Sequence, residues 1–214
     1  MTSADFPERI FVTGTDTGIG KTLVSSLLLR TLGYRYLKPI QSGIEEETDT
    51  ALVQRLSGLG AEHFWAESYC TRTPCSPHLS ARIDGIEISL EQILADIEQI
   101  SGPLIVEGAG GLLVPLNNQE FMLDLIRALN YPVILVARSE LGTINHTLLS
   151  LQALRHAGLE IWGVVMNGPP APENAEAIEF FGATRILAQI PLLPDLTPAS
   201  LQQCALEHFG RGHR

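Results

Sequence analysis

The chain has 214 residues, of which 45% are hydrophobic and 18% are charged; this composition can build a sizeable core and argues against disorder and a long coiled coil. Twenty-four acidic residues against 14 lysines and arginines give a formal net charge of −10, which argues against nucleic acid as a partner. No largely apolar run reaches the roughly 18 residues of a membrane span, and the opening residues lack the pattern of a secretion signal. With only three cysteines, expected to be reduced thiols, the sequence predicts a cytoplasmic protein with no membrane partner.

Apolar strand-like runs alternate with helix-like runs along the whole chain. Runs such as PLIV and PVILVA lack the alternation of apolar and polar residues, which is typical of strands covered on both faces in a parallel sheet. The predicted fold class is α/β, with a mostly parallel central sheet flanked by helices in a single domain over residues 1–214. In chain order, strands are expected at Ile10–Thr13, Arg35–Lys38, Ala66–Tyr69, Leu104–Glu107, Val133–Ala137, Ile161–Met166 and Ile186–Ile190. Helices are expected at Lys21–Leu32, Asp49–Ser57, Leu90–Ile100, Phe121–Asn130, Thr143–Ala157, Glu173–Phe180 and Ala199–His208.

The first predicted strand runs directly into GTDTGIGKT, residues 14–22, and then into a predicted helix. In such a junction, backbone amides and the helix N-terminus cradle phosphates, Lys21 reaches the terminal phosphates, and the Thr22 hydroxyl can ligate Mg²⁺. Five residues separate Gly14 from Gly20, one more than in the usual pattern. A GxGxxG dinucleotide motif is missing, and neither Asn that could begin an NKxD base-reading segment is followed by Lys. The segment therefore predicts a P-loop that binds ATP rather than GTP.

Two carboxylates are candidates for holding Mg²⁺ beside Thr22, because this ion prefers oxygen ligands. Glu107 ends the apolar run PLIV, where a charge is hard to explain by packing. Asp49 opens a predicted helix, where it could equally serve as an N-cap. The spacing favours Glu107 and leaves both interpretations of Asp49 open.

The segment KPIQSG follows the second predicted strand and begins with a second lysine, Lys38. We expect Lys38 to project over the same crevice as Lys21, because the carboxyl ends of parallel strands share one edge of the sheet. Two lysines at one phosphate site would stabilise negative charge that develops between them. Ser42 could bind a substrate or only shape the turn.

These segments together resemble the dethiobiotin synthetase family within the P-loop proteins. The resemblance rests on FVTGTDTGIGKT, KPIQSG, the Asp in TDTALVQ, TPCSPHLSA, VEGAGGLLVPL, PVILVARSELGTINH, GVVMNG and QIPLL, in this order across nearly the whole chain. It implies an ATP-dependent cyclo-ligase that acts on 7,8-diaminononanoate, CO₂ and MgATP. In that family reaction one amine captures CO₂ as a carbamate, the carbamate takes the γ-phosphoryl group to form a carbamic-phosphoric anhydride, and the second amine closes the cyclic urea of dethiobiotin.

The resemblance also implies roles for individual residues. Thr17, Lys21 and Lys38 would act in catalysis, and Ser42 would hold the substrate together with Lys38. Asn167 would read the adenine edge; its other interpretation is an Asn-Gly turn. The residues implied to bind Mg²⁺ are Thr22, Asp49 and Glu107, which favours the metal role of Asp49. The residues implied to bind ATP are Gly14, Thr15, Asp16, Thr17, Gly18, Ile19, Gly20, Lys21, Thr22, Asn167, Pro191 and Leu192.

The segment ELGTINH begins a predicted helix, whose first amides make an anion site suited to the substrate carboxylate. The residues of this expected site are Gly142, Thr143, Ile144 and Asn145. In the family this segment serves the active site of a partner subunit, so the resemblance implies a homodimer.

Two other classes of P-loop protein are alternatives. A partner-regulated ATPase switch of the MinD/ParA type usually carries a second lysine near the start of the P-loop, where this chain has Thr13 to Thr15. An amidating synthetase of the cobyrinate type would need a glutaminase domain, for which 214 residues leave no room. Dependence of ATP turnover on a small diamine acid and CO₂, rather than on a protein or DNA partner, would distinguish the synthetase from the switch.

Overall fold

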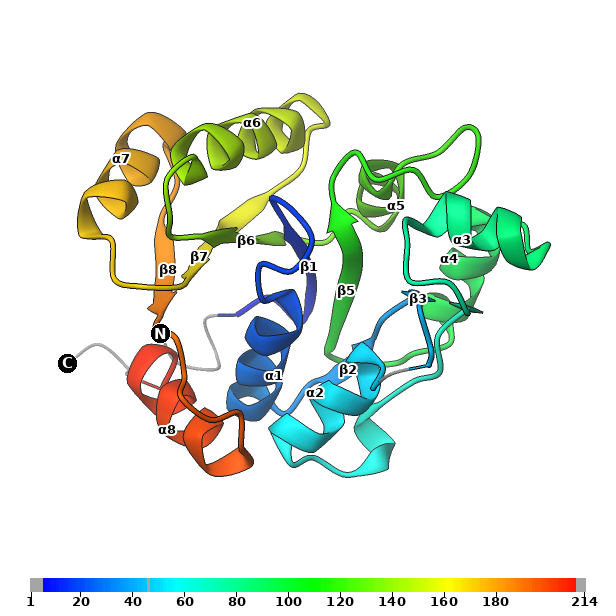
Figure 1. The fold of residues 1–214 in the computed structure, drawn as a ribbon, viewed down its shortest axis with the longest axis horizontal. Coiled ribbons are helices and arrows are strands. Elements are labelled where there is room, and N and C mark those ends of the chain that lie inside the picture. Colours follow the sequence, from blue (N-terminus) through cyan, green and yellow to red (C-terminus); the bar gives the residue numbers. More distant parts are fainter. Residues whose placement is uncertain (1–5, 46, 211–214) are drawn as a thin grey trace.

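The structure is a computed structural model that describes residues 6–45 and 47–210. Its centre is a six-stranded sheet in which every pair of neighbouring strands is parallel, in the order β2-β5-β1-β6-β7-β8 (Figure 1). The strands are β1 Arg9–Gly14, β2 Arg35–Leu37, β5 Leu104–Gly111, β6 Val133–Arg138, β7 Ile161–Asn167 and β8 Ile186–Ile190. The predicted α/β class is therefore confirmed, with each of these strands within a few residues of its predicted bounds.

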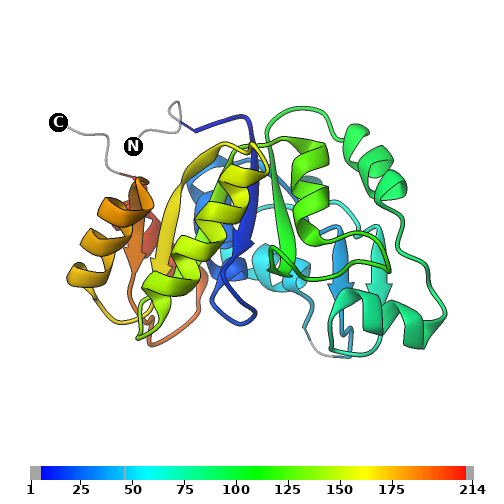
Figure 2. The same cartoon turned by 90° about the horizontal axis from the view of Figure 1, so that it is seen from above.

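Helices cover both faces of the sheet, as the two views together show (Figures 1 and 2). On one face, α1 Lys21–Leu32, α2 Asp49–Ser57 and α8 Pro198–His208 pack against alternate sheet residues such as Ile10 and Val12. On the other face, α4 Leu90–Glu98 and α5 Met122–Leu129 pack around Phe11, and α6 Thr143–His156 and α7 Pro172–Gly182 pack over β6 and β7. Burial on both faces explains the uniformly apolar strand sequences.

Four elements differ from the sequence prediction. The three-residue strand β3 Ile40–Ser42 was not predicted; it pairs in parallel with β4 Tyr69–Thr71 in a separate small sheet. The fourth strand begins at Tyr69, where the predicted segment 66–69 ends, because its pairing with β3 fixes its bounds. A helix that was not predicted, α3 Pro77–Asp84, follows Ser76, and a short 3₁₀ turn spans Ala61–His63.

The register of β5 with its neighbours determines which side chains meet at the carboxyl edge of the sheet. Val12 of β1 lies opposite Glu107, and Leu37 of β2 lies opposite Val106. The residue after Leu37 is Lys38, so this register brings the end of β2 beside Glu107. The loop after β1 opens at the same edge, where ligands of open α/β sheets bind.

Candidate active site

The loop between β1 and α1 has the backbone geometry of a phosphate cradle. Gly20 is the N-cap of α1, has φ of 96°, and approaches the Asn167 side chain so closely that a Cβ would lie 2.2 Å from Asn167 Nδ2. Gly18 also has a positive φ of 72°. In the part of the chain that the structure describes, no side chain caps the N-terminus of α1, so its first amides face the loop and can bind an anion.

Oxygen atoms from three separate elements meet beside this loop. The Thr22 hydroxyl, in the first turn of α1, lies 2.8 Å from Asp49 Oδ1 and 3.0 Å from Glu107 Oε1. The Glu107 side chain is completely buried. Thr48, rather than Asp49, is the N-cap of α2 and accepts a hydrogen bond from the Ala51 amide, so the N-cap interpretation of Asp49 is wrong. The Asp49 carboxylate instead faces the site.

Lys38 bridges the two carboxylates. Its ammonium group pairs with Asp49 and lies 3.3 Å from Glu107 Oε1, and its side chain is buried. Burial lowers the pKa of Lys38, but attraction to Glu107 and Asp49 outweighs burial and leaves that pKa raised. For Asp49, burial raises the pKa, but the neighbouring Lys38 outweighs it, so the pKa is lowered. Both groups are therefore charged at neutral pH.

Lys21 differs from Lys38 in its electrostatic surroundings. Its ammonium group donates to the carbonyl oxygen of Asp16, 3.0 Å away within the P-loop. Burial lowers the pKa of Lys21, Glu107 acts in the opposite direction, and the nearby Lys38 charge adds to the lowering, so that the pKa is about 8. A phosphate group bound here would place negative charge beside the Lys21 ammonium and favour its protonated form.

Two further predicted residues, Ser42 and Thr17, carry hydroxyl groups. Ser42 ends β3, and its hydroxyl is buried without a hydrogen-bond partner among the described residues. Thr17 is exposed at the tip of the P-loop, and its amide donates to the Asp16 carboxylate at 2.7 Å. Neither hydroxyl has a hydrogen-bond partner in the described part of the chain, but of the two only Thr17 is an exposed residue; the Ser42 hydroxyl is buried.

The residues expected at the adenine lie at the carboxyl ends of β7 and β8. Asn167 ends β7, and its amide nitrogen donates to the Ile19 carbonyl at 2.9 Å, which ties the P-loop to this strand. Pro191 and Leu192 directly follow β8, and Leu192 is 71% exposed. The structure thus brings these residues to the same edge of the sheet as the P-loop.

The N-terminus of α6 only partly matches the expected anion site. Gly142 is its N-cap, with φ of 94° and no side-chain cap. The Thr143 amide already donates to the Glu140 carbonyl at 3.1 Å, and the Thr143 hydroxyl donates to the Arg138 carbonyl at 2.5 Å. Asn145 is exposed at this end of the helix, next to the half-buried Ile144. The amide of Thr143, which was expected to bind the substrate carboxylate, therefore already donates a hydrogen bond within the chain, as does the Thr143 hydroxyl.

A groove of about 450 Å³ runs beside the P-loop. Its walls come from the P-loop at Thr15 to Thr17, the segment after β5, and α6. Two leucines in it are largely exposed, Leu113 at 65% and Leu149 at 57%. Apolar side chains left open to water next to a polar site suit an apolar ligand chain or a partner surface.

The comparisons with known proteins agree with this geometry. Residues 8–200 match the family described as an AAA domain. An ATP-dependent dethiobiotin synthetase of Agrobacterium fabrum is 48% identical over 201 residues, covering 94% of both chains. The corresponding enzyme of Brucella ovis is 47% identical with the same coverage.

The chain belongs to the ATP-dependent dethiobiotin synthetase family. Its fold is shared more widely. A ParA family ATPase from Chlorobium tepidum has a TM-score of 0.56 at 14% identity, covering 96% of this chain and 95% of its own. A chain of the MinC:MinD cell division protein complex from Aquifex aeolicus has a TM-score of 0.59 at 15% identity, covering 97% of this chain and 98% of its own. At such low identity these neighbours share only the fold with the dethiobiotin synthetases.

Two polar residues at the site of this family member were not predicted. Tyr36 of β2 is completely buried, and its hydroxyl donates to Glu107 Oε2 at 3.0 Å. Arg138 ends β6 and forms an ion pair with Asp16 of the P-loop, with 2.7 Å between Nη2 and Oδ2. Arg138 follows the apolar run VILVA, so the sequence signal that singles out Glu107 was present there as well.

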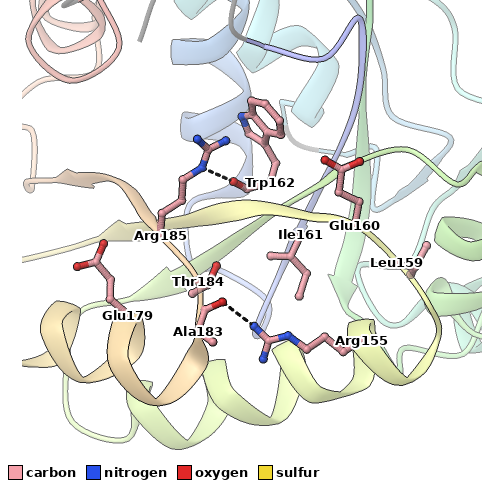
Figure 3. Close-up of a pocket in the computed structure, with 9 residues that line it drawn as sticks. All are labelled: Arg155, Leu159, Glu160, Ile161, Trp162, Glu179, Ala183, Thr184 and Arg185. Atoms are coloured by element: carbon pink, nitrogen blue, oxygen red, sulfur yellow. Dashed lines mark hydrogen bonds between the residues drawn. The ribbon is translucent and has the colours of Figure 1, made fainter. Parts of the chain in front are cut away.

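A second surface pocket lies at the opposite, amino-terminal end of β7 and β8 (Figure 3). Arg155 donates there to the carbonyl oxygens of Gly182 and Ala183. Arg185 donates to the Trp162 carbonyl at 2.7 Å and stacks over the indole ring. Both guanidinium groups are thus engaged in hydrogen bonds to backbone carbonyl oxygens of other segments. This pocket lies at the end of the sheet opposite to the P-loop.

No helix in the described residues is long and apolar enough to span a membrane.

Proposed function

We propose that this chain makes dethiobiotin from 7,8-diaminononanoate, CO₂ and ATP. The observation that carries the proposal is the meeting of Lys21, Lys38, Asp49 and Glu107 beside an open P-loop, in a chain of this family. In the proposed reaction, one amine adds to CO₂ and loses a proton to give a carbamate. A carbamate oxygen then displaces ADP from the γ-phosphorus. The second amine attacks the resulting carbonyl, phosphate leaves, and the cyclic urea closes.

The two lysines suit this phosphoryl transfer because negative charge passes from ATP to the carbamate. Lys21, within the P-loop, is proposed to hold the ATP phosphates together with the backbone of residues 14–22 and the Thr17 side chain. Lys38, at the end of β2, is proposed to stabilise charge on the carbamate side. The unpartnered Ser42 hydroxyl supports a role in hydrogen bonding to the substrate. No covalent intermediate on the protein is needed, since the residues only position the reactants and neutralise charge.

Mg²⁺ is proposed as the cofactor, held by Thr22, Asp49 and Glu107. The fit is supported by three oxygen-bearing side chains that meet within hydrogen-bond distance, which is the donor chemistry that Mg²⁺ prefers. When bound, Mg²⁺ neutralises charge on the ATP phosphates. Among the described residues, no group of three or more His, Cys, Asp and Glu side chains could hold a metal. A magnesium site completed by nucleotide phosphates needs only one or two carboxylates.

The ends of β7 and β8 are proposed to hold the adenine, with Asn167 turning toward the base edge and Pro191 and Leu192 lining the pocket. Their position at the edge of the sheet next to the P-loop supports this assignment.

A homodimer is proposed, in which the N-terminus of α6 of one subunit binds the substrate carboxylate of the other. The exposed Leu113 and Leu149 beside α6 support an interface at this surface. The residues proposed for the carboxylate remain Gly142, Thr143, Ile144 and Asn145, with Thr143 acting after release of its present contacts.

Residues 1–214 are proposed to form one synthetase domain, because β1 and β8 belong to the same sheet. A cytoplasmic location is also proposed; its support is the three free cysteines, since thiols stay reduced in that compartment.

The test is to incubate the purified chain with MgATP, bicarbonate and 7,8-diaminononanoate and to search for dethiobiotin by mass spectrometry. We expect dethiobiotin and ADP to form in equal amounts. When the diamine is omitted, neither product should form. ATP hydrolysis that ignores the diamine but responds to a protein or DNA partner would refute the synthetase and favour the switch.

A further inference from the structure

Tyr36 occupies an unusual place for a tyrosine, in the middle of β2 and without any exposure to solvent. Its ring packs edge-on against Phe64, with 6.0 Å between the ring centres. The core of α1 and α2 surrounds it on the same face of the sheet. The ring is thereby fixed, and among the described residues its hydroxyl has one partner, Glu107 Oε2, at 3.0 Å.

Tyr36 and Lys38 lie two residues apart on one extended segment, so their side chains leave the same side of it. Each takes a different oxygen of Glu107: Tyr36 donates to Oε2 and Lys38 to Oε1. The Thr22 hydroxyl shares Oε1 with Lys38. Tyr36 therefore holds the carboxylate through Oε2, and the other oxygen, Oε1, faces Thr22 at the start of α1.

We propose that Tyr36 is a positioning residue that fixes the Glu107 carboxylate in the orientation required to bind a divalent cation together with the nucleotide. This inference rests on the proposed function, because that proposal assigns Glu107 to Mg²⁺. Groups that hold a metal ligand in place are often worth a factor of about 10 to 100 in metal affinity or activity. A tyrosine that only filled the core would contribute to stability and leave the cation affinity unchanged.

The experiment measures the gain in affinity for a non-hydrolysable ATP analogue between magnesium-free buffer and saturating Mg²⁺, by calorimetry. Tyr36→Phe keeps the ring and removes the hydroxyl. We expect its magnesium-dependent gain to fall about tenfold, at the low end of the range for such groups, with unchanged affinity in magnesium-free buffer. Tyr34→Phe is the matched control, because Tyr34 lies just before β2 and away from Glu107; its gain should equal that of the unchanged protein.

Glu107→Gln separates the failure of this inference from the failure of the proposed metal site. If Glu107→Gln loses the gain and Tyr36→Phe keeps it, the positioning role is overturned and the metal site stands. If Glu107→Gln keeps the full gain, the metal assignment fails and the positioning role fails with it. The double variant adds a second test: Tyr36→Phe should have no further effect once Glu107 is Gln, because Tyr36 acts through that carboxylate. If the losses of magnesium-dependent affinity in the two single variants add up in the double variant, the inference is overturned. This comparison holds even if both single variants are less stable than the unchanged protein.

Discussion

At the scale of single residues, Lys38 balances two carboxylates in a buried position. We expect Lys38→Gln to lower kcat by roughly 10²- to 10³-fold, the effect of losing one preorganised group that stabilises developing charge. The affinity for ATP should change little, since the P-loop and Lys21 remain. The measurements are dethiobiotin formation at saturating substrates and ATP affinity by calorimetry.

Lys38→Arg provides the control for charge. We expect only partial rescue, because a planar guanidinium cannot fit where a compact ammonium contacts both Asp49 and Glu107. Circular dichroism should show that both variants are folded. A Lys38→Gln enzyme with nearly normal kcat, or one that loses ATP binding in parallel with turnover, would contradict the assigned role.

Lys21 leads to a prediction about pH. Its pKa is lowered to about 8 in the nucleotide-free chain, chiefly by burial. Bound phosphates favour the charged ammonium and so raise this pKa. Above pH 8 the free lysine is mostly neutral and the bound lysine protonated, so ATP binding must take up a proton and must weaken as the pH rises. Calorimetry at pH 8.5 in two buffers of different ionisation enthalpy should detect this uptake.

The same titrations at pH 7 are the control. Lys21 is already protonated there in the free chain, so its contribution to proton uptake should vanish. Equal uptake at both pH values would show that another group takes up the proton.

At the scale of elements, α2 places Asp49 as its first residue, and the Thr48 cap fixes that end of the helix. We expect Thr48→Ala to lower the free energy of unfolding by about 1 kcal/mol and to raise the Mg²⁺ concentration required for activity. Ser89→Ala is the matched control, since Ser89 caps α4 in the same way, by accepting from the Gln92 amide. Its stability should fall similarly, without any change in magnesium requirement. Denaturant unfolding measures the stability of both variants, and magnesium titrations of activity measure the Mg²⁺ concentration that each requires. If the two variants require the same Mg²⁺ concentration, the Thr48 cap has no effect on the metal role of Asp49.

The elements that the sequence predicted well carry strong local signals. An apolar run identifies β6, and the joined signals of strand, glycines and Lys21 identify the P-loop. The three-residue strand β3 was missed because its partner strand, β4, lies far along the chain and no local pattern marks that pairing. The helix α3 was missed although Ser76 followed by Pro77 is a start signal, because its sequence PHLSARID carries too few apolar residues to show a helical period.

The same distinction holds at the site. Lys38 and Glu107 could each be placed at the end of a strand from local sequence alone. Their contact depends on the pairing of β2 with β5, with Leu37 opposite Val106, which is a property of the assembled sheet. Tyr36 reads as an ordinary core residue in the sequence, because only that pairing turns its hydroxyl toward Glu107.

At the scale of the whole molecule, the proposed dimer can be tested by substituting two equally exposed leucines, one at the proposed interface and one away from it. Leu149 of α6 and Leu206 of α8 are each 57% exposed and belong to helices on opposite faces of the sheet. We expect Leu149→Glu to shift the protein toward monomers and to lower dethiobiotin formation, because a charge at an apolar interface disrupts packing. Leu206→Glu should leave both unchanged. Sedimentation analysis and activity assays are the measurements, and a fully active monomer would disprove the shared site.

The central place of β1 in the sheet has a consequence during biosynthesis. This strand is made first, yet its two neighbours, β5 and β6, comprise residues 104–111 and 133–138. As the chain leaves the ribosome, the P-loop therefore emerges before either flanking strand, and both strands are present only after residue 138 has been made. A nascent or truncated chain that ends before Val133 presents an unpaired apolar edge, which favours aggregation and recognition by chaperones. We therefore expect chains that end before β6 to lack a formed nucleotide site.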